Sequence, residues 1–301
     1  MTTTSEARAA ALAREPLRVA GPQPGFASGT WLSIKDIVGQ RELLGMLVRR
    51  ELKAKYKDST LGFLWSMLRP LAMLLIYYIA LGEFLGAARQ IDDFAIFIFT
   101  GLTAWTLYSD IVITGTGSIV TNAGLIKKIY LPREVFPLSV VGSALFNFVI
   151  QLGILLAATA LVGRFPTGGR WLYLPLAMGV LVVFATALAL LLSALNVYLR
   201  DIQYLVEIII MVFFWISPIV YSWGLVAPKM PNPFLEQLYL ANPMTLVVLG
   251  FQQVFWVAGD GSLVPDQLGT RLVVALAVGV AFLWVSQRVF ARLQANFAQE
   301  L

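Results

Sequence analysis

The sequence predicts an all-α protein that crosses a membrane six times, with an amphipathic interface helix before the first span and re-entrant outer-side helices before the last. Three observations support this fold class. Hydrophobic residues make up 58% of the 301 residues and charged residues only 13%. A soluble chain averages about 25% charged residues, so this inventory cannot cover a water-facing surface. Long apolar segments recur along the chain, and most basic residues flank them on one predicted side.

Six segments are long enough to be membrane spans. A helix needs about 20 mostly apolar residues to cross a hydrocarbon core of roughly 30 Å. The segments are residues 61–85, 94–119, 135–162, 172–199, 202–223 and 272–290. A seventh apolar stretch, residues 238–257, is ambiguous because it contains Asn242-Pro243 near its start and Gln252-Gln253 near its middle.

The basic residues orient the spans and resolve the seventh stretch. With six spans and both termini in the cytoplasm, 17 of the 22 Lys and Arg residues lie inside. This excess is the positive-inside signature, and a seventh crossing would move Arg288 and Arg292 outside against it. Residues 227–270 are therefore expected to form a re-entrant gate region on the outer side. We expect a multi-pass protein of the bacterial cytoplasmic (inner) membrane, in contact with membrane lipid.

Two segments precede the first span, a predicted tail and a predicted amphipathic helix. Residues 1–33 are rich in Ala, Arg, Thr, Pro and Gly and are predicted to be a disordered cytoplasmic tail. Residues 34–59 show apolar positions at helical spacing with a basic opposite face, which predicts an amphipathic helix in the membrane interface. This helix either anchors the first span or docks a cytoplasmic partner, and its pattern fits both roles. Residues 60–301 form the six-span domain.

Composition also excludes several kinds of chemistry. The chain has no cysteine and no histidine, which removes thiol metal sites and the commonest general base. No G-x-x-x-x-G-K-[ST] loop is present, so this chain lacks the usual phosphate cradle for ATP. We expect no catalytic residue, no bound metal and no nucleic-acid partner. An intramembrane enzyme acting on lipid-linked sugars should show clustered acids or bases at one depth, which this sequence lacks.

Polar and aromatic residues inside the spans are the candidate functional residues. Charged groups at the bilayer centre are costly, so intramembrane polar residues attract attention. They either hydrogen-bond neighbouring helices or serve transport, and they are Asp110, Glu207, Asn147 and Gln151. Aromatic residues lie in the first and fifth spans, some near mid-membrane. They either pack in the core or line a path where their rings stack on sugars, and they are Tyr77, Tyr78, Phe213, Phe214, Trp215, Tyr221 and Trp223.

Four motifs, in order, resemble the membrane (permease) subunit of bacterial ATP-binding-cassette polysaccharide exporters, of the O-antigen, teichoic-acid or cell-wall galactan type. The first joins the interface helix to the first span, the second is an inner loop, the third is a turn into the fifth span, and the fourth lies on the outer side. The resemblance covers residues 34–292. Its motifs are YKDSTLGFLWSMLRPL (Tyr56 to Leu71), NAGLIKKIYLPREVFPL (Asn122 to Leu138), LNVYLRDIQYLV (Leu195 to Val206), and SPIVYS with ANPMT (Pro218, Tyr221, Asn242 and Pro243).

The resemblance implies a homodimer whose first and fifth spans enclose a channel for a polyprenyl-pyrophosphate-linked glycan. It also implies that a cytoplasmic ATPase subunit binds ATP and Mg²⁺ and receives a coupling loop at residues 122–133, with Asn122, Lys127, Lys128 and Arg133. The anionic lipid head of such a substrate needs a cation near the inner leaflet. Arg69 is the first candidate, with Arg49, Arg50 and Lys53 on the interface helix; alternatively, Arg69 reaches the inner headgroups simply as a membrane anchor.

Two other functions compete with this interpretation. The nearest is an exporter of the same superfamily that moves a drug or small lipid without a long glycan. The mid-membrane aromatic residues of the first and fifth spans favour the glycan. A non-transporting scaffold has no need of a re-entrant gate, so the sequence disfavours it. The expected role is export for cell-envelope biogenesis, driven by ATP hydrolysis in a separate subunit.

Overall fold

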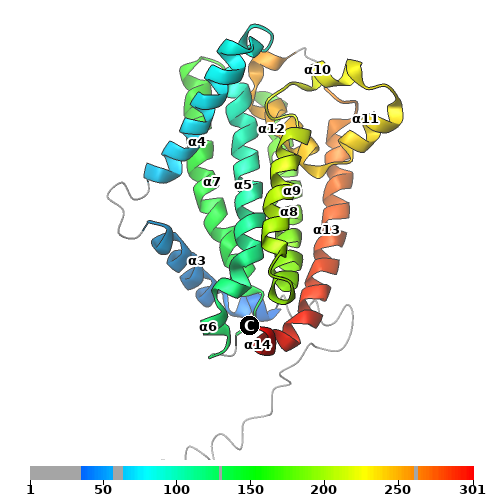
Figure 1. The fold of residues 1–301 in the computed structure, drawn as a ribbon. Helices are drawn as coiled ribbons and strands as arrows, with labels where there is room; N and C mark the ends of the chain where they lie inside the picture. The colour runs from blue at the N-terminus through cyan, green and yellow to red at the C-terminus, as the bar shows by residue number, and fades with distance from the viewer. Residues whose placement is uncertain (1–34, 57–63, 129–130, 261–263) are drawn as a thin grey trace, which may run out of the picture.

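The computed structural model describes residues 35–56, 64–128, 131–260 and 264–301, and every described element is helical or a turn (Figure 1). The predicted tail of residues 1–33 lies outside the described residues, as do Ser59, Leu61 and Gly62 of the first motif. The long helices run roughly alongside one another and form one bundle. Both α3 and α14 lie at the same end of this bundle, near α6.

The helices follow one another up and down the bundle. The first half contains α3 (Arg41–Tyr56), α4 (Leu64–Tyr77), the π-helical η1 (Tyr78–Phe84), α5 (Phe94–Thr121), α6 (Ala123–Ile126) and α7 (Val135–Leu161). The second half contains α8 (Tyr173–Tyr198), α9 (Ile202–Ile216), α10 (Trp223–Val226), α11 (Pro233–Leu240), α12 (Pro243–Phe255), α13 (Leu268–Leu293) and α14 (Phe297–Glu300). Short 3₁₀ turns join them at Ala87–Arg89, Gly168–Leu172, Ala227–Lys229, Val257–Gly259 and Gln294–Asn296.

Five helical segments are long and apolar enough to cross a membrane: Met67–Phe84, Phe94–Thr121, Val135–Leu161, Gly168–Tyr198 and Leu268–Asn296. They correspond to five of the six predicted spans. The all-α polytopic fold class is therefore confirmed.

The fifth predicted span differs from the structure. We expected residues 202–223, but α9 ends at Ile216. Ser217 is extended, with ψ of 146°, and Pro218 follows it. Proline has no amide hydrogen and disfavours helical conformation in the residue before it, which explains this end. Fifteen residues at about 1.5 Å each give roughly 22 Å, less than a full hydrocarbon core.

The ambiguous seventh stretch forms a bent pair of helices. The axes of α11 and α12 meet at 79° across the short break at Ala241 and Asn242. Each helix begins with a proline at its first position, and the side chain of Asn232 or Asn242 caps it. In Figure 1, α12 lies near the upper ends of α5 and α9 and α11 lies near the upper end of α13, at the end of the bundle away from α14. A bend of this size occurs both in a broken span and in a re-entrant pair, so re-entry into the membrane stays a prediction.

Helix α5 lies at the centre of the bundle. It packs against α4, α7, α8, α9 and α12. In its apolar 18-residue stretch, 78% of the residues are buried. Helix α4 and the following η1 are peripheral: in the apolar stretch Met67–Phe84, only 11% of the residues are buried. The main core contains large side chains from α5 and α12 that are fully buried, including Phe97, Phe99, Phe251 and Phe255.

Small residues allow the helices around α8 to approach closely. A Cβ atom at Gly115 of α5 would lie 2.6 Å from Cβ of Ala189, and one at Gly250 of α12 would lie 2.9 Å from Cβ of Ala177. A Cβ at Gly279 of α13 would lie 2.8 Å from the Phe184 ring. In lipid, helices associate through such packing because the surrounding chains are as apolar as the side chains.

Gly115→Leu should therefore destabilise the bundle by about 1–3 kcal/mol, because the added side chain cannot fit between α5 and α8. The measurement is the thermal unfolding midpoint of the full chain purified in detergent. Gly153→Leu is the matched control, since Gly153 is exposed on α7 and a Cβ atom added there would have no neighbour within 4 Å. Equal midpoints for the two variants would contradict the close packing described above.

Candidate functional site

An aromatic seam joins α4, α5 and α9. The ring of Tyr77 stacks on Phe214, with centroids 5.8 Å apart. Phe214 meets Trp105 of α5 edge-on at 5.5 Å, and Trp105 lies 5.5 Å from Tyr108. Tyr78 packs beside Phe94 at 6.4 Å. Two predicted channel residues from distant segments, Tyr77 and Phe214, thus lie in contact.

The predicted channel aromatics divide into exposed and buried residues. Phe213 is 37% exposed and Trp215 is 53% exposed, on the outward face of α9. Phe214 and Trp223 are buried against other aromatic rings of the same chain. In this conformation, therefore, only part of the set is available to line a surface. Both α4 with η1 and α9 present broad apolar faces, which include Leu68, Leu75, Ile76, Ile79, Ile208, Ile209 and Met211.

The outer end of α9 is fixed by hydrogen bonds to the re-entrant region. The hydroxyl of Tyr221 lies 2.9 Å from the carbonyls of both Trp215 and Ile216, which share its single proton. The Tyr239 hydroxyl donates to that of Tyr221 at 3.3 Å, and Trp223 stacks on Tyr239 at 5.6 Å. The last carbonyls of a helix lack partners within it, and the Tyr221 hydroxyl provides one for the last two carbonyls of α9.

Two amides extend this connection to α12. Gln252 is buried, and its Nε2 donates to the carbonyl of Pro218 at 2.8 Å. Asn242 Nδ2 donates to the hydroxyl of Ser217 at 3.4 Å. The sequence analysis used Gln252 only to question whether residues 238–257 cross the membrane, and it missed Tyr239 and Ser217. An amide inside an apolar stretch could have indicated such a contact, because a buried amide requires a hydrogen-bond partner.

At the inner end, α3 is docked on the bundle. Leu47 is buried, and the side chain of Val48 fills the space over Gly142 of α7. Arg50 donates to Glu51 and to the side-chain carbonyl of Asn122, which links α3 to the start of α6. Arg50, predicted to contact the lipid pyrophosphate, and Asn122, predicted to belong to the coupling loop, are therefore hydrogen-bonded to each other.

The remaining predicted cations lie at the surface. Arg49, Lys53, Arg69, Lys127 and Lys128 are exposed. Arg69 lies on α4, and residues 57–63 between α3 and α4 are outside the described part of the chain. These positions leave the side chains accessible to lipid headgroups or to a cytoplasmic protein.

Arg133 lies in a cluster at the start of α7. Its guanidinium lies 5.6 Å from the centre of the Phe297 ring in α14. The neighbouring Glu134 is only 4% exposed and accepts a hydrogen bond from Gln294 Nε2 at 3.3 Å. Burial raises the pKa of the Glu134 carboxyl, although Gln294, Arg288 and Arg133 act in the opposite direction. The cluster packs the C-terminal helix beside the predicted coupling loop, and sequence reasoning missed Glu134, Gln294 and Phe297.

The intramembrane polar residues occupy different surroundings. Asp110 lies 3.7 Å from Lys55 Nζ, so its partner comes from the interface helix. Glu207 is exposed on α9 and accepts from Gln203 Nε2 at 3.2 Å, which also donates to the Ile113 carbonyl of α5. Asn147 and Gln151 are buried in α7. The four residues lie on three helices, and the two carboxylates, Asp110 and Glu207, have different partners. This arrangement does not resemble a proton relay.

Comparison with known proteins places this arrangement in a family. The family model described as "ABC-2 type transporter" matches residues 42–256. An O-antigen export system permease protein RfbA from Myxococcus xanthus is 32% identical over 269 residues, which cover 89% of this chain and 98% of that protein. A protein of the same name from Klebsiella pneumoniae is 28% identical, covering 86% of this chain and 95% of the relative.

A more distant relative is the polysialic acid transport protein KpsM of Escherichia coli. It is 24% identical over 213 residues, which cover 69% of this chain and 79% of the relative. The relatives named permeases are transporter subunits, so an ATP-binding partner subunit is implied for this chain, which has no phosphate-binding loop of its own. From the family match over most of its length and its bundle of membrane-crossing helices, the chain belongs to the ABC-2 type transporter family.

Proposed function

We propose that this chain is the permease subunit of an ABC transporter that exports a lipid-linked polysaccharide across the cytoplasmic membrane. The observation that carries the proposal is 32% identity over nearly the whole length of an O-antigen export permease. Relatives named for two different polysaccharides, O-antigen and polysialic acid, support a polysaccharide as the substrate class. The chain's own contribution is a path through the membrane, because ATP and Mg²⁺ are bound by the partner subunit.

The path lies between two copies of the chain. Helices α4 and α9 have large apolar faces that nothing covers among the described residues. Pairing of two copies would enclose these faces, and the exposed rings of Phe213 and Trp215 would then face the path. Aromatic rings suit the C–H faces of sugars, whereas tyrosine hydroxyls can exchange hydrogen bonds with sugar hydroxyls. The proposed assembly is therefore a homodimer with both termini in the cytoplasm.

The ATPase subunit acts on the inner end through α6. Lys127 and Lys128 follow α6 and are exposed, which makes them available to acidic groups on a partner. Asn122 at the start of α6 is hydrogen-bonded to Arg50 of α3. A displacement of α6 would thus act on both α3 and α5, since α5 ends at Thr121. Allosteric transmission of this kind requires such a contiguous contact.

Depletion of the protein in its own cells should leave a long polyprenyl-linked glycan on the cytoplasmic side of the membrane, because synthesis continues while export stops. The measurement is the sugar composition and sidedness of the lipid-linked glycans, before and after depletion. A control strain expresses the chain from a plasmid. If the lipid-linked pool stays unchanged and the cells instead become sensitive to a small amphiphile, a drug or lipid exporter is the correct function.

Trp215→Ala should reduce glycan export by about twofold to tenfold, since one aromatic contact with the moving sugar chain is lost. The same depleted strain supplies the assay, with export compared at equal amounts of protein in the membrane. Trp284→Ala on α13 is the matched control, because Trp284 is also a partly exposed tryptophan but belongs to the last span. Similar losses for both variants would argue against a role of α9 in the path.

Arg69→Ala should reduce export about tenfold if the Arg69 guanidinium binds the pyrophosphate of the substrate, because an ion-paired hydrogen bond is worth about 1.5–3 kcal/mol. The reason for choosing Arg69 is its exposed position on α4, in the predicted channel wall. Arg69→Lys retains the positive charge and should recover part of the activity. Full export by Arg69→Ala at normal protein levels would exclude this role.

A further inference from the structure

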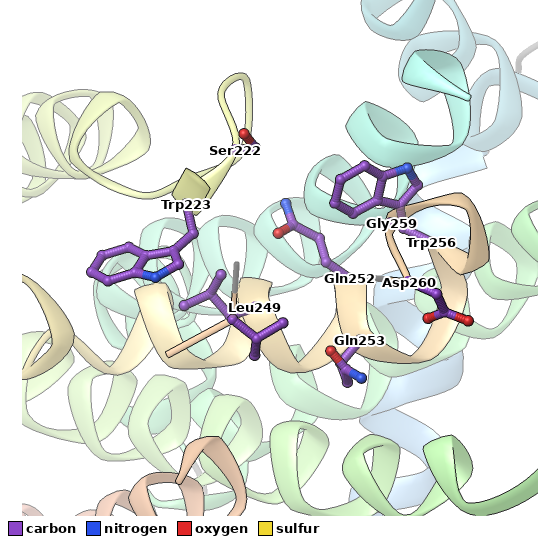
Figure 2. Close-up of a pocket in the computed structure, with 9 residues that line it drawn as sticks. Ser222, Trp223, Leu249, Gln252, Gln253, Trp256, Gly259 and Asp260 are labelled. Carbon is purple, nitrogen blue, oxygen red and sulfur yellow. The ribbon is translucent and has the colours of Figure 1, made fainter. Parts of the chain in front are cut away.

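The outer end of the bundle contains a small recess, between the turn after α9 and the last turns of α12 (Figure 2). Its volume of about 30 Å³ has room for a water molecule or two. Gln252 and Trp256 line it, and their side chains are bonded to the carbonyls of Pro218 and Asp92. The recess is therefore too small for a substrate unit. The residues that can respond to an ATPase subunit lie at the opposite end, beside α6 (Figure 1).

Buried side chains at this inner end form a second hydrophobic cluster, separate from the main core. It includes Leu47 of α3, Ile126 of α6 and Phe297 of α14. Figure 1 shows these three helices at the same end of the bundle. Although α6 has only four residues, Ile126 is 7% exposed, so the short helix rests on this cluster through a buried side chain.

The predicted coupling loop, residues 122–133, is held at both of its ends. At its first residue, the side-chain carbonyl of Asn122 accepts a hydrogen bond from Arg50 of α3. At its last residue, the guanidinium of Arg133 lies 5.6 Å from the centre of the Phe297 ring. A cation over an aromatic face is attracted by the electrons of the ring. The first contact therefore joins the loop to α3, and the second joins it to the segment that follows α13.

This segment, residues 294–297, is here called the inner turn, and it is fixed by several contacts. Gln294 Nε2 donates to the buried carboxylate of Glu134 at 3.3 Å. The Phe297 ring is fully buried and meets the ring of Tyr198 in α8 at 6.3 Å. The Tyr198 hydroxyl donates to the carbonyl of Leu293 at 2.8 Å. A buried carboxyl group that loses its hydrogen-bond partner is destabilising, so the contact with Glu134 constrains the position of the inner turn.

The inner turn connects the coupling loop to the last membrane-crossing helix. It follows α13 directly, since α13 ends at Leu293. Lys127 and Lys128, where the proposed partner acts, lie in the loop between the two held residues, Asn122 and Arg133. A displacement of the loop therefore acts on α3 at one end and on the inner turn at the other. Contiguous contacts of this kind can carry energetic coupling between distant sites.

We infer that the inner turn positions the coupling loop, so that a movement of the ATPase subunit at α6 is passed to α13 as well as to α3 and α5. Phe297 and Gln294 are positioning residues, because they act through Arg133 and Glu134 rather than on ATP or the substrate. The inference rests on the proposed function, since it requires that an ATPase subunit acts on α6.

The test compares glycan export with ATP hydrolysis. The full chain is assembled with its ATPase subunit in lipid vesicles that carry lipid-linked glycan from the cell's own membranes. ATP is added outside, and the glycan moved to the lumen is measured per ATP hydrolysed. Phe297→Ala should lower this ratio about threefold to tenfold while ATP hydrolysis continues, because the loop then moves without α13. Gln294→Ala should lower the ratio in the same direction, because the hydrogen bond to Glu134 is lost.

Phe282→Ala is the matched control. Phe282 of α13 also meets an aromatic ring of α8, that of Phe184 at 6.1 Å, but it lies about three helical turns before the end of α13. The unfolding midpoint of each variant is measured alongside, and a lower ratio counts only when the midpoint matches that of Phe282→Ala. If Phe297→Ala is destabilised, Gln294→Ala decides.

An unchanged ratio in both Phe297→Ala and Gln294→Ala would overturn the inference, even if export and ATP hydrolysis fell together. An equal drop in Phe282→Ala would also overturn it, because the loss would then follow from packing between α8 and α13 in general. Either result in a complex that exports glycan leaves the proposed function intact. If the unaltered complex hydrolyses ATP without moving the glycan, the proposed function fails and the inference fails with it.

Discussion

The close approach of three helices to α8 is the constraint on which the rest of the structure depends. Gly115 of α5, Gly250 of α12 and Gly279 of α13 each face a side chain of α8 with no room for a Cβ atom. A membrane offers little hydrophobic driving force between helices, so contact area and van der Waals packing must hold them together. The glycines supply that contact, and Gly250 fixes α12 against α8 within the bundle.

Because these contacts concentrate on α5, α8, α12 and α13, the helices α4 and α9 lie outside the tightest packing. An aromatic seam connects them, with Phe214 between Tyr77 and Trp105. Stacked rings lose less contact when they slide past each other than helices that pack closely at glycines. The end of α4 continues into η1, which is π-helical. Short π-helical segments within helices frequently occur at functional sites. The proposed channel wall is thus built on two helices that lie outside the tightest packing.

Apolar length was sufficient to predict five of the helical spans and the interruption of the seventh apolar stretch, because lipid imposes such lengths on any chain that crosses it. The end of α9 could have been predicted from Ser217-Pro218, but continuous hydrophobicity through Trp223 concealed it. Contacts such as Arg50 to Asn122 could not be predicted, since each residue satisfies a surface pattern alone and only the fold brings them together. Glu134 was missed because a carboxylate beside Arg133 normally remains solvated, whereas here it is buried and accepts a hydrogen bond from Gln294, in the turn before α14.

The outer end of α9 shows how a helix that stops early can still be part of a channel. Its last carbonyls would be unsatisfied at membrane depth, where each such group costs several kcal/mol. Tyr221 turns back to bond two of them, Tyr239 bonds Tyr221, and Gln252 holds the same turn from α12. The helix end is therefore tied to α12, which the packing of Gly250 fixes against α8. A movement of α9 must break or carry these bonds, so the re-entrant region can restrain the opening of the path at the outer side.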